Sequence, residues 1–262
     1  MIVIGELING MYKDVGKAIA NRETDVIQHL AEEQVKSGAT ALDVNTGPYS
    51  RDPTQDMRWM VEAIQKSVDV PLALDSTKPE VVEEGLKLAK RRAIINSTSA
   101  DADRMDRIFS LAKRYNAQVI GLTMDRSGVP DSKDRRLELA ATIVAKAADC
   151  GVAAEDLYLD PIVLPVNVAQ PQAREVLEAI REFRLLSDPA PQTVIGLSNV
   201  SQRAKSRSLI NRTFLVMAVA GGLSAAILDP LDRELMDAMI AAELLVNRNI
   251  YCDSFLEAYR KK

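Results

Sequence analysis

The stretch PLALDSTKPEVVEEGLKLAKRRAIINST, residues 71–98, decides the fold class because it spans one complete strand–helix–strand unit. Short apolar runs at 72–76 and 93–97 have the length and composition of buried strands. Between them, Val81, Val82 and Leu86 recur at helical spacing. Parallel strands need a long crossover connection of this kind. The stretch therefore predicts a parallel sheet covered by helices.

The same unit recurs along the chain. Another helical pattern runs from Val26 to Val35, with Ser37-Gly38 as its stop signal. We expect strands at residues 2–8, 39–45, 72–76, 93–97, 119–124, 157–163, 193–199 and 225–229. Eight such units in 262 residues predict a closed (β/α)8 TIM barrel, with an open doubly wound sheet as the alternative. No Pro/Gly/Ser linker interrupts the chain, so residues 1–262 are expected to form one domain.

The charge balance limits the partners. Lys and Arg number 33 against 37 Asp and Glu, a net charge of −4, which argues against nucleic acid or an anionic membrane as the main partner. No apolar run approaches the ~18 residues of a membrane span, and the N-terminus reads as a strand, so we expect a cytoplasmic protein. Cys150 and Cys252 are far apart and predict ordinary buried or half-buried thiols, with neither a disulfide framework nor a zinc site.

Polar residues stand where the predicted strands end, which in a barrel is the face that carries the active site. They are Asn9, Asp43, Asn45, Asp75, Asn96, Asp125, Asp160, Ser198, Asn199 and Asp229. Any one of them could instead cap a helix or form a turn. An Asp or Asn at nearly every strand end is less easily explained by capping alone. We therefore expect a polar binding site at this rim.

The residue types at the rim restrict the chemistry. The only histidine, His29, falls inside a predicted helix, which excludes a His base or a His/Cys zinc site. Carboxylate-bound Mg²⁺ stays an alternative that no D-x-D cluster or phosphate-binding Gly loop supports, so no bound metal is expected. Carboxylates and amides suit a neutral heterocycle rich in N–H groups. A pterin presents a 2-amino group beside a ring N–H, and one carboxylate can accept both.

Seven rim motifs and the segments after them follow one known pattern. They are GELING at 5–10, LDVNTGP at 42–48, LDST at 74–77, INST at 95–98, GLTMD at 121–125, LDPIVLP at 159–165 and GLSNVS at 196–201, followed by INRTF at 210–214 and YCDSF at 251–255. Together they resemble the methyltetrahydrofolate:corrinoid protein methyltransferases over the whole chain. The pattern is also similar to the folate module of cobalamin-dependent methionine synthase.

The resemblance implies a pterin-binding barrel and assigns roles to particular residues. Those implied to bind substrate are Asp75, Asn96 and Asp160 on the pterin ring, and Ser198, Gln202 and Arg207 on a loop that lies over the folate and faces the corrinoid. Asn199 is implied as the catalytic residue at N5, beside the methyl group. One departure is Leu7, where many relatives carry Arg, and it puts contacts near the first strand in question.

The implied reaction moves the N5-methyl group between methyltetrahydrofolate and the cobalt of a corrinoid. Cobalt(I) displaces the methyl group while protonation of N5 makes the leaving group a neutral amine. Because the chain has no D-x-H-x-x-G motif, the corrinoid is expected on a partner protein. The resemblance also implies a homodimer, and the apolar runs at 214–220 and 236–246 offer faces for either core or interface.

Three alternatives remain at this point. The acceptor or donor could be a corrinoid protein of O-demethylase or betaine/methylamine metabolism, with transfer toward methyltetrahydrofolate. The chain could be a folate-binding or corrinoid-docking module without turnover. Dihydropteroate synthase shares the fold, but its basic S-R-K near strand seven and R-x-H at strand eight are replaced here by Ser198-Asn199-Val200 and Leu228-Asp229-Pro230.

Overall fold

Eight parallel strands, each hydrogen-bonded to the next in chain order, close into a barrel where β8 pairs with β1. The computed structural model describes residues 1–260. The strands are β1 (Ile2–Gly5), β2 (Ala41–Asn45), β3 (Leu72–Asp75), β4 (Ile94–Thr98), β5 (Gln118–Leu122), β6 (Leu157–Asp160), β7 (Gln192–Gly196) and β8 (Ala225–Leu228). The predicted β/α barrel is confirmed, and the open sheet is excluded.

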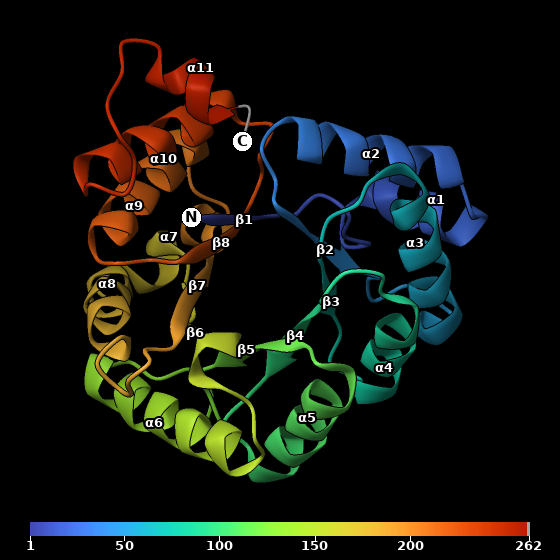
Figure 1. Cartoon of the computed structure of the whole chain (residues 1–262), viewed down its shortest axis with the longest axis horizontal. Coiled ribbons are helices and arrows are strands. Elements are labelled where there is room, and N and C mark those ends of the chain that lie inside the picture. The colour runs from blue at the N-terminus through green and yellow to red at the C-terminus, as the bar shows by residue number, and fades with distance from the viewer. Residues whose placement is uncertain (261–262) are drawn as a thin grey trace.

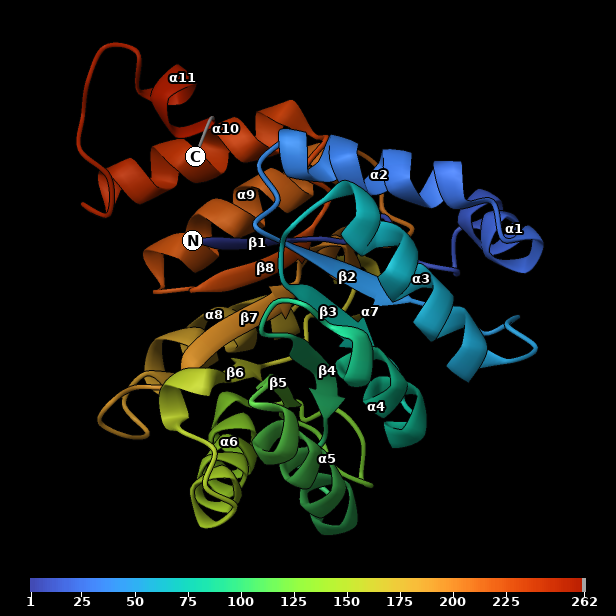
Figure 2. The same cartoon turned by 45° about the vertical axis from the view of Figure 1, so that its right-hand side comes forward.

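Helices surround the strands on the outside (Figure 1). They are α1 (Lys13–Asn21), α2 (Thr24–Lys36), α3 (Pro53–Ser67), α4 (Pro79–Leu88), α5 (Ala102–Tyr115), α6 (Lys133–Asp149), α7 (Val166–Ala169), α8 (Gln172–Phe183), α9 (Arg207–Ala220), α10 (Arg233–Leu245) and α11 (Phe255–Arg260). Two 3₁₀ segments add η1 (Ala154–Asp156) and η2 (Leu197–Ser201). The last helix, α11, packs on α10 at the outer edge of the molecule (Figures 1 and 2).

The helix boundaries follow local signals. The predicted stop after α2 is confirmed, because Gly38 adopts a φ of 104°, which side-chain-bearing residues rarely reach. The side chain of Asp52 accepts a hydrogen bond from the backbone N–H of Gln55 and caps α3, which has Pro53 in its first turn. His29 lies in helix α2, as predicted, and its side chain is exposed.

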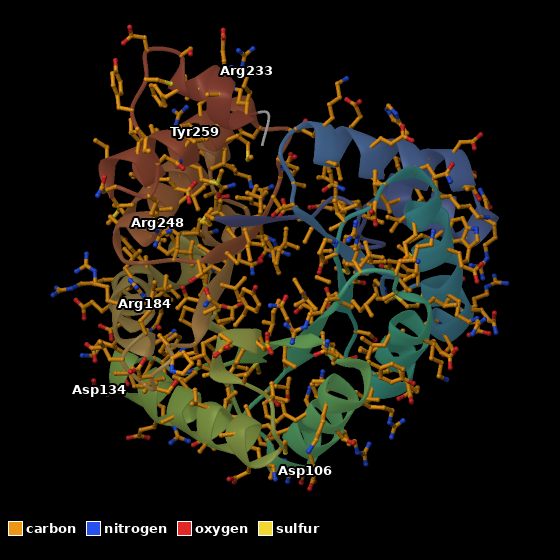
Figure 3. The ribbon with its side chains drawn as sticks, in the orientation of Figure 1. Asp106, Asp134, Arg184, Arg233, Arg248 and Tyr259 are labelled. Carbon is orange, nitrogen blue, oxygen red and sulfur yellow. The ribbon has the colours of Figure 1, made fainter. Side chains whose placement is uncertain are left out.

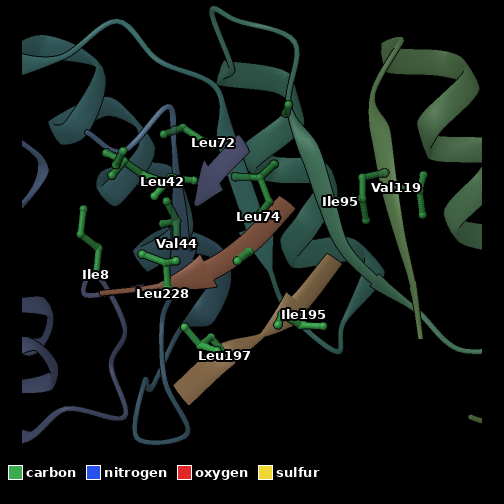
Figure 4. Close-up of a cluster of buried hydrophobic side chains, with 14 of the residues drawn as sticks. Ile8, Leu42, Val44, Leu72, Leu74, Ile95, Val119, Ile195, Leu197 and Leu228 are labelled. Carbon is green, nitrogen blue, oxygen red and sulfur yellow. The ribbon is translucent and has the colours of Figure 1, made fainter. Parts of the chain in front are cut away.

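Buried apolar side chains form two clusters, one inside the barrel and one around it. The inner one takes one buried side chain from each strand: Ile4, Ala41, Ala73, Ile94, Ile120, Tyr158, Val194 and Ala225. The outer one lies between strands and helices, and Figure 4 shows part of it, including Leu42, Leu74 and Val119. Successive residues of a strand face opposite sides. The residue two positions beyond each member of the inner ring therefore also faces the barrel axis.

Several strands end earlier than the sequence predicts, whereas β2 ends as predicted and β4 runs one residue further. The strands β1, β5 and β6 end at Gly5, Leu122 and Asp160, and the segments beyond them are irregular. In β6 the cause is local: Pro161 has no N–H to donate, and Ile162 adopts a φ of 64°. The seventh strand ends at Gly196, and Leu197–Ser201 form η2, so the prediction that Asn199 lies in a strand is wrong.

The outer surface carries mixed charge. Asp106, Asp134 and Arg184 extend outward from the helical ring in Figure 3. Both cysteines are free; Cys150 is half-buried as predicted, whereas Cys252 is exposed, contrary to the prediction. Within residues 1–260, no helix has the length and apolarity needed to cross a membrane.

Candidate functional site

Polar side chains form a layer directly above the inner apolar ring. They occupy positions two residues beyond ring members on five strands: Glu6, Asp43, Asp75, Asn96 and Asp160. Asp43 and Asp160 are buried, and the other three are partly buried. The alternation that sends apolar residues inward at one level thus sends acids and amides inward at the next. The predicted polar rim is a layer inside the barrel mouth.

Amide side chains hold two of these carboxylates by hydrogen bonds between strands, one from β2 to β3 and one from β4 to β2. The amide nitrogen of Asn96 donates to Oδ1 of Asp43 at 3.0 Å, and that of Asn45 donates to Oδ2 of Asp75 at 2.6 Å. Asp75 and Asn96 are register partners on β3 and β4. Each carboxylate keeps one oxygen that accepts no hydrogen bond from residues 1–260. These oxygens are free to accept N–H donors from a ligand.

Burial raises the pKa values of the carboxyl groups in this layer. The pKa of Asp43 lies well above its ordinary value, because of desolvation first and then repulsion from Asp75. Desolvation also raises the pKa of Asp75, partly offset by the hydrogen bond from Asn45. Burial raises the pKa of Asp160 from 3.8 to about 7, against the backbone N–H of Ile162, which donates to its Oδ1 at 2.7 Å. Such buried carboxylates are stabilised most by a ligand whose N–H donors replace the hydrogen bonds to water that burial removes.

Two arginines that were not predicted from sequence hold the ends of the site strands. Arg104, from α5, donates to the backbone carbonyls of Thr77 at 2.7 Å and Ser97 at 2.5 Å, and so ties the segments after β3 and β4 together. Arg136, from α6, is fully buried, and its Nε donates to the carbonyl of Pro161 at 2.8 Å, next to Asp160. No local sequence signal marks either residue, since both contacts depend on tertiary packing.

The segment after β7 places Asn199 over the barrel interior. Gly196 follows the inward-facing Val194 by two residues, and a Cβ atom on Gly196 would lie 3.0 Å from the amide nitrogen of Asn199. The amide of Asn199 therefore lies close to where an inward-facing side chain of residue 196 would begin. It makes no side-chain hydrogen bond within the described chain, and Asn199 caps no helix, since Ser206 precedes α9.

Ser198, Gln202 and Arg207 lie around this 3₁₀ segment. The hydroxyl of Ser198 donates to Oε1 of Glu6 at 2.7 Å. Arg207 folds back onto η2, with Nε 3.2 Å from Oγ of Ser201 and Nη2 3.4 Å from the carbonyl of Ser198. Gln202 is exposed, and its backbone N–H donates to the carbonyl of Asn199 at 3.1 Å. The structure thus brings the predicted residues to one end of the barrel.

Other polar strand ends serve turns. Oδ1 of Asn9 accepts from the N–H of Met11, and Oδ1 of Asp229 accepts from that of Leu231, both at 2.9 Å. Asp125 accepts from Ser127 and Arg135. For these three, the alternative of a turn-forming role is confirmed. Leu7 faces away from the layer, and its N–H donates to Oε1 of Gln34 at 3.0 Å, so this position is anchored through the backbone.

A pocket of about 340 Å³ opens beside the layer. It is lined by Asn45 and Asp75 together with residues of the loops after β1, β2 and β3, among them Met11, Pro48 and Lys78. Within residues 1–260, no group of three or more His, Cys, Asp or Glu side chains is arranged to hold a metal ion. The arrangement suits a flat ligand with several N–H donors.

Comparisons with known proteins agree with this geometry. The chain is 28% identical over 266 residues to the methylcorrinoid:tetrahydrofolate methyltransferase of Eubacterium limosum, covering 100% of this chain and 97% of that protein. It is 29% identical over 240 residues to the methionine synthase of Mycobacterium tuberculosis, covering 87% of this chain but only 20% of that longer protein.

Solved structures share the fold. The dihydropteroate synthase of Coxiella burnetii, solved with pteroic acid, superposes with a TM-score of 0.69 at 16% identity, over 95% of this chain and 93% of that one. Residues 14–229 match the sequence profile of the pterin binding enzymes. The match covers most of the chain and includes strands β2 to β8. The protein therefore belongs to the pterin-binding enzyme family.

Proposed function

We propose that this chain moves the N5-methyl group between methyltetrahydrofolate and the cobalt of a corrinoid that a partner protein carries. The observation that carries the proposal is the layer of paired carboxylates and amides beside Asn199, whose amide is unpartnered within the described residues. The similarity along the whole chain to a methylcorrinoid:tetrahydrofolate methyltransferase supports it. On this proposal the protein is a transferase that acts on a folate.

Asp75, Asn96 and Asp160 hold the pterin ring. The 2-amino group and adjacent ring N–H of a pterin form a donor pair, which the unoccupied oxygens of Asp75 or Asp160 can accept. Asn96 donates its amide nitrogen to Asp43 and so presents its carbonyl oxygen to the ligand. The inner apolar ring lies beneath the layer and gives the flat heterocycle an apolar surface that excludes water.

Asn199 acts at N5. A methyl group on a tertiary amine leaves poorly, because the leaving group would be an amide anion, and protonation of N5 removes that obstacle. An amide side chain offers both a donor and an acceptor, so it can follow N5 through both protonation states. The nucleophile is cobalt(I), which displaces the methyl group in line. The chain's task is to position the two partners and to favour the protonated amine.

The partner protein docks over the barrel mouth. Exposed apolar side chains follow three different strands: Met11 after β1, Tyr49 after β2 and Val168 in α7 after β6. Gln202 and Arg207, both exposed, face the same side and contact the folate or the corrinoid protein. Ser198 acts indirectly, since its hydroxyl is engaged by Glu6.

The proposal includes a homodimer and a cytoplasmic location. Most residues of the apolar runs in α9 and α10 pack into the core, among them Phe214, Leu215 and Met239. What stays exposed is Met217 on α9 and Leu245 and Val246 at the end of α10, and this face is the one we assign to the second copy.

The nearest alternative functions differ from this proposal only in the direction of methyl transfer and in the pathway served. The name of the Eubacterium limosum relative describes a methylcorrinoid donor, which favours transfer toward tetrahydrofolate, as in O-demethylase or betaine/methylamine systems. Dihydropteroate synthase is disfavoured, because η2 presents Ser198-Asn199-Val200 where that family carries a basic triad. Its solved members share the fold at 14–21% identity.

One set of assays separates these functions. Purified protein is mixed with 5-methyltetrahydrofolate and free cob(I)alamin, and formation of methylcobalamin is followed spectroscopically; the reverse reaction starts from methylcobalamin and tetrahydrofolate. We expect turnover in both directions. Folate binding without transfer in either direction would leave a docking module, and condensation of a pterin pyrophosphate with p-aminobenzoate would indicate the synthase.

A further inference from the structure

Ser198 is held from two sides, one residue before Asn199. Its hydroxyl donates to Oε1 of Glu6 at 2.7 Å, across 192 positions of sequence, and its carbonyl accepts from Arg207 at 3.4 Å. The Glu6 contact joins the end of β1 to η2, and the backbone N–H of Glu6 donates to the carbonyl of Leu228 at the end of β8. The anchor for η2 is thus the barrel itself.

The position of Asn199 is sensitive to small shifts of η2. Its amide nitrogen would lie 3.0 Å from a Cβ atom on Gly196, so the turn leaves little free space on the barrel side. The side chain has no hydrogen bond of its own within the described chain, and its location therefore depends on the backbone that carries it. Support for that backbone comes from the two contacts of Ser198 and from the contact of Arg207 with Ser201.

A carboxylate at position 6 costs free energy of desolvation that a purely structural contact would not require. Desolvation raises the pKa of its carboxyl, and nearby Asp229 raises it further, against the hydrogen bond from Ser198. Asp43 and Arg207 are the other charged groups that face it. An apolar residue at this inward position would extend the inner ring at lower cost. A contact that fixes a catalytic turn explains why an acid stands here.

We propose that Glu6 is a positioning residue for methyl transfer: through Ser198 it fixes η2 so that the amide of Asn199 stays at N5 of the folate. The inference rests on the proposed function, since it needs a methyl group to be transferred. It assigns Glu6 the part of a hydrogen-bond acceptor, and no proton moves through it.

The test compares Glu6→Gln, Glu6→Ala and Ser198→Ala. Glutamine offers an amide oxygen to the same hydroxyl, so Glu6→Gln should keep kcat within about threefold, whereas Glu6→Ala and Ser198→Ala should each lower it about 10- to 100-fold. KM for methyltetrahydrofolate should change less than kcat. The double variant Glu6→Ala/Ser198→Ala should be no worse than either single one, because both remove the same contact.

Glu243→Gln is the matched control, since it alters a buried glutamate that pairs with the N-terminus at the opposite end of the barrel. It should lower stability without lowering kcat. A normal kcat in both folded Glu6→Ala and folded Ser198→Ala would overturn the inference. So would a Glu6→Gln variant as slow as Glu6→Ala with an altered pH profile of kcat, which would make Glu6 a proton donor. Lack of transfer by the wild-type protein would instead overturn the proposed function.

Discussion

The amide nitrogen of Asn45 lies 2.6 Å from Oδ2 of Asp75, so β2 and β3 present one carboxylate–amide unit to the barrel mouth. A second unit, formed by Asn96 and Asp43, crosses from β4 to β2. In each unit the amide donates a hydrogen bond to one carboxylate oxygen and leaves the other oxygen for the ligand. The site is therefore organised before a ligand arrives, which lowers the cost of binding.

Removal of a carboxylate that we propose to hold the pterin should weaken folate binding. Asp75→Ala and Asp160→Ala should each cost about 2–4 kcal/mol, because each leaves N–H donors of the buried pterin without acceptors. Isothermal titration with tetrahydrofolate measures the effect. Asp69→Ala, which removes an exposed carboxylate paired with Arg91, should bind normally. Wild-type affinity in both site variants would show that the pterin binds elsewhere.

Folate affinity should depend on pH through Asp160. Its pKa of about 7 means that the carboxyl is mostly protonated below neutrality, whereas the pterin donors need the ionised form. The dissociation constant should therefore rise about tenfold per pH unit below 7 and level off above it. In Asp160→Asn this dependence should be absent. An equal slope in wild type and variant would assign the titration to another group.

The same group makes the free protein less stable as pH rises. An acid whose pKa is higher in the folded than in the unfolded state stabilises the fold at low pH, and that contribution is lost as pH rises from about 4 to about 7. Between pH 5 and 8 the loss from Asp160 should be about 2–3 kcal/mol. Urea unfolding of wild type and Asp160→Asn at both pH values measures it. The variant should lose less.

Much of the fold could be predicted from the sequence, because each strand of this barrel is also a short apolar run. The ends of the strands could not be predicted, because they depend on where the neighbouring strand stops pairing and on the local backbone conformation. Ile162, with its positive φ, ends β6 earlier than its apolar neighbours suggest. Asn199 lies in a 3₁₀ turn for the same kind of reason, although its sequence reads as a strand end.

The polar layer at the barrel mouth was predicted in part. Asp75, Asn96 and Asp160 could be found because polar residues directly follow apolar runs. Glu6 was missed, although counting two positions on from Ile4 places it in the same inward-facing layer. Arg104 approaches the layer from a helix, and a contact between its guanidinium and the carbonyls of Thr77 and Ser97 has no signature in local sequence.

Turnover should need no metal bound by this chain. The site offers carboxylates that are each paired with an amide side chain, and the proposed transfer assigns no step to a cation held by them. Dialysis against a chelator, followed by assay with added cob(I)alamin, should leave the rate unchanged. Restoration of a lost rate by Zn²⁺ or Mg²⁺ would contradict this.

The protein should be a dimer in solution. Leu245 is 83% exposed and lies with Met217 and Val246 on the face that we assign to the second copy. Light scattering at micromolar concentration should give twice the 28.7 kDa mass of one chain, and Leu245→Glu should lower it to one. Leu185→Glu, at a similarly exposed leucine after α8, is the control and should stay dimeric. A monomeric wild type would reject the dimer.

The last prediction concerns Asn199. If its amide stabilises protonated N5 while the methyl group departs, the contact is stronger in the transition state than in the ground state. Asn199→Ala should then lower kcat more than it weakens folate binding. Loss of one such hydrogen bond should raise the barrier by about 2–4 kcal/mol, or about 30- to 1,000-fold in rate.

A purely structural role for Asn199 makes the opposite prediction. A residue that mainly supported its turn would, when replaced by alanine, lower the melting temperature and leave the rate per folded molecule nearly intact. The side chain of Asn199 makes no hydrogen bond in the described chain that alanine would remove, so its loss should not weaken the turn. We therefore expect a melting temperature within about 2 °C of wild type, alongside the reduced kcat. Asp75→Ala should show the contrasting pattern, with most of its effect in binding, because the pterin edge is held equally in both states. An unchanged kcat with a depressed melting temperature would make Asn199 structural.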